Sequence, residues 1–119
     1  MATKQDGFKD FVLDQLATLH GVTNRAMFGG YGLYQDGIFF GIIHKGRLYF
    51  KVSPNTVGLY EEQGMTPFRP NAKQTLKSFY EVPIDIIEDA ELLTTWATAA
   101  CQCNRELKPS RKITTQSSA

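Results

Sequence analysis

The sequence offers few side chains whose type and spacing suit catalysis or metal binding. Cys101 and Cys103 are its two cysteines. On a helix, positions two apart point about 200° away from each other, so this pair does not hold one metal ion. Cys103 falls on an apolar helical stripe and is expected to be a packed thiol, which leaves Cys101 as the better candidate for a reactive one. We therefore predict no metal site and no cofactor.

Carboxylates and histidines are the other groups that could carry out proton transfer. The clustered carboxylates are Asp85, Glu88, Asp89 and Glu91. They precede or begin predicted helices, where negative charge is electrostatically favoured, whereas general acid–base catalysis of the glycosidase type needs opposing carboxylates across a cleft. The two histidines, His20 and His44, have no sequence-level partner that marks a nucleophile–base pair. These patterns predict that the protein is not an enzyme.

The glycine-rich segment 25–53 carries the clearest structural signal. Gly29, Gly30 and Gly32 are spaced like part of a phosphate-binding loop, but the Lys-Ser/Thr pair and the helix that complete such a loop do not follow. Aromatic and β-branched runs, separated by Asp-Gly and Lys-Gly pairs, instead predict strands joined by tight hairpins. Two adjacent glycines inside the first strand, 25–35, predict a β-bulge or a close backbone approach.

The hydrophobic periodicity of the whole chain predicts an α+β domain with the element order α-β-β-β-α-β-β-α. The predicted helices cover 5–20, 54–63 and 90–107, with a short helical turn at 83–87, and the predicted strands cover 25–35, 38–44, 47–52, 65–69 and 75–82. An antiparallel sheet of about five strands would pack against the helices. Trp96 is the expected anchor of the last helix, on a face shared with Leu92 and Cys103. Residues 1–108 form one domain, and 109–119 are a polar and basic tail that we expect to be disordered.

A two-residue turn at Lys45-Gly46 fixes the register of two neighbouring strands, because it places His44 opposite Arg47. One face of the sheet then carries Phe39, Gly41, Ile43, Leu48, Phe50 and Val52. The opposite face, called the second face below, carries Ile38, Phe40, Ile42, Arg47, Tyr49 and Lys51. It is too apolar to be left in water. Three covers are consistent with the sequence: a helix of the same chain, a second copy in a homodimer, or a ligand or nucleic-acid strand.

Charged and amphipathic side chains on these strands are our candidates for an interaction surface. They are Arg25, Arg47, Tyr49, Lys51 and Phe40. Basic residues around sheet aromatics are used to bind single-stranded nucleic acid, although cross-strand pairing inside a hairpin explains the same residues. The chain before Asn104 has nine basic and eleven acidic residues, and the remainder has four basic and one acidic. That distribution is not the broad basic footprint of a dedicated nucleic-acid-binding protein, so the alternative function is weak nucleic-acid binding through the basic tail and this sheet face.

Two sequence blocks, MFGGYGLY at 27–34 and LYFK at 48–51, carry a resemblance to a known family. The positions that form its motif are Met27, Phe28, Gly29, Gly30, Gly32, Tyr34, Gly37 and Trp96. With these blocks, the stretch from about Phe8 to Ala100 resembles the N-terminal domain of the TfoX/Sxy competence regulators of bacteria.

The resemblance implies an α+β domain with an antiparallel sheet. It also implies a regulatory role in the expression of DNA-uptake genes, exerted through protein–protein contacts with the cyclic-AMP receptor protein and the transcription machinery. Full-length family members carry a second, C-terminal helical domain, whereas here we expect a stand-alone N-terminal domain followed by a short basic tail. The polar first ten residues lack the apolar segment of a signal peptide, so we expect the protein to be cytoplasmic.

Overall fold

The computed structural model describes residues 4–27 and 29–107, which form an antiparallel sheet and four helices. The strand order is β1-β2-β3-β4-β6-β5, and all pairings are antiparallel. In chain order the elements are α1 (Lys4–Gln15), β1 (Val22–Met27), β2 (Gly30–Gln35), β3 (Ile38–His44), β4 (Arg47–Lys51), α2 (Val57–Glu62), β5 (Pro67–Asn71), β6 (Gln74–Glu81), α3 (Ile84–Ile87) and α4 (Ala90–Leu107). The predicted α+β class with an antiparallel sheet is confirmed, with six strands rather than about five. The predicted tail, 109–119, lies outside the described residues.

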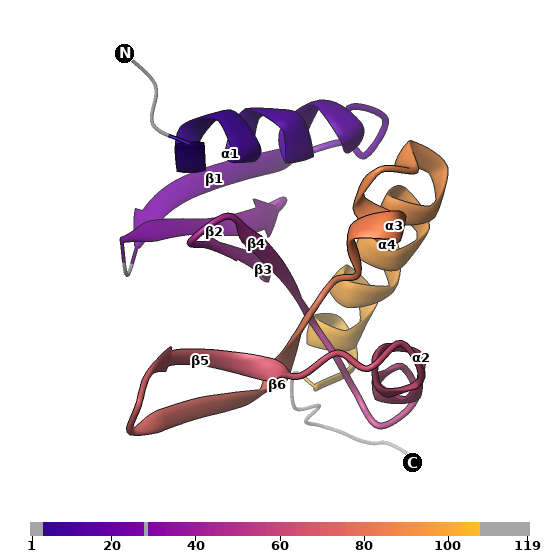
Figure 1. The fold of residues 1–119 in the computed structure, drawn as a ribbon. Helices are drawn as coiled ribbons and strands as arrows, with labels where there is room; N and C mark the ends of the chain where they lie inside the picture. Colours follow the sequence, from indigo (N-terminus) through magenta and orange to yellow (C-terminus); the bar gives the residue numbers. More distant parts are fainter. Residues whose placement is uncertain (1–3, 28, 108–119) are drawn as a thin grey trace.

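The helices α1 and α4 cover one face of the sheet, and the β5–β6 hairpin extends to the other side (Figure 1). Apolar side chains of α1 and α4 pack against the central strands and form the main core. Its fully buried members include Val12, Leu16, Leu33, Phe40, Ile43, Leu48, Phe50 and Leu93. Burial of several large aliphatic and aromatic side chains stabilises this layer, at about 1.5–3 kcal/mol each relative to exposure. Within the described residues, no helix is both long and apolar enough to cross a bilayer.

Tight hairpins join the central strands as predicted. Asp36 and Gly37 have φ angles of 50° and 83°, and Lys45 and Gly46 have 53° and 73°, which is the positive-φ pair that a two-residue type I′ turn requires. The pairing of His44 with Arg47 confirms the predicted register of β3 and β4.

The segment 25–35 is two strands rather than one bulged strand, so the single strand and its bulge were wrong. The strands β1 and β2 pair antiparallel along their length, and the pair Met27–Gly30 closes the hairpin next to Gly29, whose φ is 77°. Glycine at that position makes a left-handed backbone possible without strain. Gly30 lies so close to β3 that a Cβ there would collide with the carbonyl oxygen of Ile43, which confirms the predicted alternative of a close backbone approach. Adjacent glycines therefore serve a turn and a close backbone contact.

A β-bulge in β3 changes which aromatic side chain reaches the core. The pairing with β2 shifts between Leu33–Gly41 and Tyr34–Phe39, which leaves Phe40 without a direct partner. The extra residue reverses the alternation of side chains along the strand. Phe40 is consequently buried in the main core at 0% exposure, while Phe39 turns to the second face. The predicted positions of these two residues were reversed.

The buried face of α4 is displaced from the predicted one. Leu92 is 44% exposed, and Leu93 is fully buried with Ala97 and the nearby cysteines. The small side chain of Ala97 permits close packing of α4 on β3 and β4. Trp96 is half-buried at the side of this contact, where it meets the ring of Tyr60 edge-on at 4.7 Å.

Candidate interaction surface

The second face is covered in part by the β5–β6 hairpin of the same chain. Phe68 of β5 is fully buried there, with its ring centroid 4.7 Å from that of Tyr49 and 5.3 Å from that of His44. Ile42 and Phe79 complete this second hydrophobic cluster. A strand, rather than any of the three covers considered from the sequence, thus shields this part of the face.

The remainder of the second face carries a row of aromatic rings with a cation at each end. The rings of Tyr34 and Phe39 are 5.2 Å apart, and those of Phe39 and Phe79 are 5.1 Å apart. The Arg25 guanidinium lies 5.9 Å from the Tyr34 ring, and the Lys51 ammonium lies 5.2 Å from the Phe79 ring. We call these five side chains the cation–aromatic row. The negative electrostatic potential over the face of an aromatic ring attracts a cation placed there.

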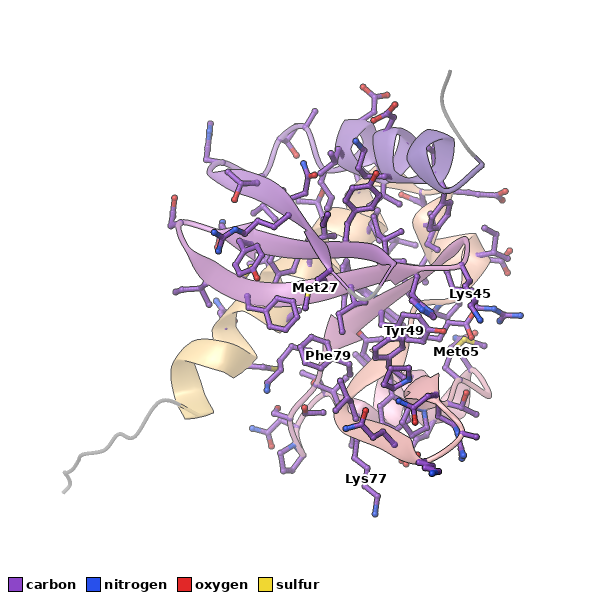
Figure 2. The ribbon with its side chains drawn as sticks, turned by 90° about the vertical axis from the view of Figure 1, so that its left-hand side faces the viewer. Met27, Lys45, Tyr49, Met65, Lys77 and Phe79 are labelled. Carbon is purple, nitrogen blue, oxygen red and sulfur yellow. The ribbon has the colours of Figure 1, made fainter. Side chains whose placement is uncertain are left out.

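Figure 2 looks onto this side of the molecule. Met27, Phe79 and Tyr49 lie in its middle, while Lys45 and Lys77 lie toward the outer parts of the view. Met27, Tyr34 and Phe39 are half-buried, so their side chains remain accessible to solvent. The face therefore presents apolar and aromatic surface, with two lysines toward its outer parts.

Gly32 lies directly beneath the aromatic side chains of Tyr34 and Phe39 in this row. A Cβ at Gly32 would collide with the sulfur of Met27, and it would come within 3.2 Å of ring carbons of Phe39 and Tyr34. The side chains of Met27 and the two aromatic residues therefore fold across the glycine. This arrangement gives the glycine a packing role that is unrelated to phosphate binding.

Arg47 and Tyr49 occupy the rim and the interior of the second face, respectively. Arg47 donates to both carboxylate oxygens of Glu81 from Nη1, at 2.9 and 3.1 Å, and its side chain is 60% exposed. An exposed ion pair of this kind contributes about 0.2–1 kcal/mol. Tyr49 is 8% exposed, and burial, followed by the nearby negative charge of Glu81, raises its pKa.

The five residues predicted to form the interaction surface thus lie in different environments. Arg25, Arg47, Tyr49 and Lys51 are on the second face, although Tyr49 is mostly beneath Phe68. Phe40 is in the core and is not part of the surface.

Sequence reasoning missed Phe39 and Phe79, which join the two cations into one row. The shift in β3 that exposes Phe39 has no signal in the alternation of the strand, and Phe79 lies on a strand whose partner could not be assigned from the sequence. Phe28, a member of the predicted motif, is outside the described residues.

Charge is divided between the sheet and the helices. From Val22 to Glu81, excluding α2, the chain has seven cations, Arg25, Lys45, Arg47, Lys51, Arg69, Lys73 and Lys77, and two carboxylates, Asp36 and Glu81. Over residues 7–20, α2 and 84–103, it has one cation, Lys9, and eight carboxylates, Asp10, Asp14, Glu61, Glu62, Asp85, Glu88, Asp89 and Glu91. The overall charge of +1 conceals this separation. A partner of the opposite sign would be attracted to the strands and their turns and repelled by the helices.

The remaining candidate groups have structural contacts in the described part of the chain. Cys101 and Cys103 are buried free thiols, and Thr56 Oγ1 lies 3.5 Å from the Cys103 sulfur. Asp89 accepts a hydrogen bond from the backbone N–H of Leu92 and caps α4. No group of three potential metal-ligating side chains occurs among the described residues. A cavity of about 100 Å³ beside Tyr60 is small compared with typical ligand pockets of about 300–1,000 Å³.

The fold and this face define an α+β domain whose helices cover one side of an antiparallel sheet and whose other side has exposed aromatic and cationic residues. The TfoX N-terminal domain family matches residues 14–104 of the 119-residue chain. The chain therefore belongs to that family, as its glycine and aromatic motif predicted. No curated protein matches the chain.

Proposed function

We propose that this domain is a non-enzymatic regulator of DNA-uptake genes that acts through protein–protein contacts of its second face. The observation that carries the proposal is the cation–aromatic row, in which three contacting rings lie between Arg25 and Lys51. Arginine and aromatic side chains are the residue types that most often dominate protein interfaces. The setting of this activity is transcription in the cytoplasm.

The charge of the sheet favours an acidic partner surface. The strands and their turns carry seven cations, two of them in the row, against two carboxylates, whereas the helical layer would repel such a partner. Arg25 and Lys51 make ring contacts but no ion pair among the described residues. Their charges are thus available to a partner, in contrast to that of Arg47, which is paired with Glu81.

Family membership suggests the cyclic-AMP receptor protein as the partner to test. The full chain, immobilised through an N-terminal tag, should retain the purified receptor protein in the presence of cyclic AMP. Deletion of the gene in its host should lower DNA uptake. Retention no greater than on beads that carry an unrelated protein of similar charge would count against this partner.

Single-stranded nucleic acid, bound by the second face together with the basic tail, is a second candidate, because rings in a row beside cations suit base stacking and phosphate contacts. This alternative predicts a steep salt dependence of the affinity for an oligonucleotide. Contact with about six phosphates would weaken binding about 300-fold between roughly 50 and 200 mM salt. Lys51→Ala should weaken binding as well. If removal of residues 109–119 abolished binding while Lys51→Ala had no effect, the tail rather than the second face would be the binding site.

A further inference from the structure

The strand β1 is an edge of the sheet, and its exposed backbone offers a place for another strand to pair. Four of its six residues are exposed, from Thr23 to Ala26. The opposite edge, β5, contains Pro67 and Pro70, and proline lacks the N–H that a new strand would need. β1 contains no proline and is the less protected edge.

The hydrogen-bonding phase of β1 identifies which backbone groups point outward. The N–H of Asp36 donates to the carbonyl of Gly21 at 3.0 Å, immediately before the first β1–β2 pair. Hydrogen-bonded and non-hydrogen-bonded pairs alternate in an antiparallel ladder. It follows that Val22, Asn24 and Ala26 direct their N–H and C=O groups away from β2, toward the free edge.

We propose that β1 pairs antiparallel with β1 of a second copy of this chain, centred on Asn24. A two-fold axis at Asn24 places Asn24 opposite its own counterpart and Val22 opposite the counterpart of Ala26, so the outward groups of all three residues pair. Thr23 falls opposite the counterpart of Arg25. Centring the pairing one residue later would instead place Arg25 opposite Arg25, which like-charge repulsion disfavours.

The register about Asn24 is the reason to assign this edge to a second copy, because every outward N–H and C=O of Val22, Asn24 and Ala26 then pairs and no like charges oppose each other. Identical strands meet through a two-fold interface, in which each contact occurs twice. The two-fold axis of an antiparallel pair is perpendicular to the sheet, so the two second faces lie on the same side of one continuous sheet. A dimer would thus present two copies of the cation–aromatic row side by side.

Sedimentation equilibrium of the full chain tests this pairing. Five paired residues per strand predict a weak dimer, so the measurement extends to about 1 mM protein. We expect the average mass to rise from 13.4 kDa toward twice that value as concentration increases. Asn24→Pro removes an outward N–H from each copy and should weaken dimerisation about tenfold or more, whereas Asn24→Ala retains that N–H and should dimerise like the parent.

A charge pair provides an independent test of the register and does not depend on proline being tolerated. Asn24→Lys and Asn24→Asp should each weaken self-association, because like charges then face each other across the axis. An equimolar mixture of the two variants should restore dimers. A parent chain that remains monomeric to about 1 mM would overturn the proposal. So would dimers that persist in Asn24→Lys and Asn24→Asp separately, since the axis would then lie elsewhere.

Discussion

Replacing Phe68 with alanine removes the side chain that holds the β5–β6 hairpin against the second face. The ring is fully buried and contacts those of Tyr49 and His44 at 4.7 and 5.3 Å. Truncation of a buried phenylalanine costs about 3–5 kcal/mol, through lost transfer free energy and the cavity left behind. At about 4 °C per kcal/mol for a domain near this size, we expect Tm to fall by roughly 12–20 °C.

Urea denaturation followed by circular dichroism measures the free energy of unfolding for this variant. Leu59→Ala is the matched control, because Leu59 is 49% exposed and its truncation should change stability by about 0.5 kcal/mol or less. Phe68→Ala should also lower the pKa of Tyr49 toward 10.0, since burial is the largest cause of its upward shift. A loss of stability no greater than that of Leu59→Ala would refute the packing of β5 on the second face.

Three further changes test separate contacts. Gly30→Ala should lower the free energy of unfolding by about 3 kcal/mol, the upper end of the range for overpacking, because the new methyl group meets a backbone carbonyl of β3. Gly32→Ala should lower it by only about 1 kcal/mol, because its methyl group meets the flexible end of a methionine side chain. Urea unfolding compares the two variants, and equal losses would contradict this reasoning. Arg47→Ala should lower the free energy of unfolding by less than about 1 kcal/mol, because the ion pair of Arg47 with Glu81 is exposed. The difference from the parent should shrink in about 1 M salt. A larger loss that does not depend on salt would contradict the assignment of Arg47 to an exposed ion pair. Burial raises the pKa of the Tyr60 hydroxyl strongly, so the unfolded chain loses that proton first as pH rises above 10.0. The free energy of unfolding should therefore fall by about 1.4 kcal/mol per pH unit above that pH. Tyr60→Phe should remove this contribution to the pH dependence of stability, and an unchanged dependence between about pH 9 and 11 would contradict the reasoning.

Much of the fold is predictable from local sequence signals. Asp36-Gly37 and Lys45-Gly46 specify their turns because few residue pairs adopt two successive positive φ angles. The turn at Lys45-Gly46 then determines the register of β3 and β4. The last helix, 90–107, has the predicted bounds, since Asp89 supplies an N-terminal cap.

The errors arise where distant backbone decides the geometry. Gly29 and Gly30 are compatible with a bulge, a close backbone approach or a turn, and the packing of Gly30 against β3 decides among these. The shift beside Phe39 and Phe40 depends on how β2 meets β3. Two consecutive phenylalanines give no indication of which one faces the core, so the cation–aromatic row could not be assembled from the sequence.

The separation of charge was also hidden in the sequence. A count over the chain before Asn104 gives a slight excess of acids, and that average suggests no basic surface. Folding places most carboxylates on helices and most cations on strands and their turns. Because Arg25 and Lys51 are 26 positions apart, their relation to one row of rings becomes visible only when β1 and β4 are placed in the same sheet.

The affinity for the purified cyclic-AMP receptor protein, measured by isothermal titration calorimetry at low salt, most directly tests the second face as the interaction surface. The double variant Arg25→Glu with Lys51→Glu reverses both ends of the cation–aromatic row and should weaken binding about tenfold or more. The control is Lys73→Glu, at an exposed position of the β5–β6 turn, and it should retain most of the affinity. Equal affinity of the parent and the double variant would contradict the account.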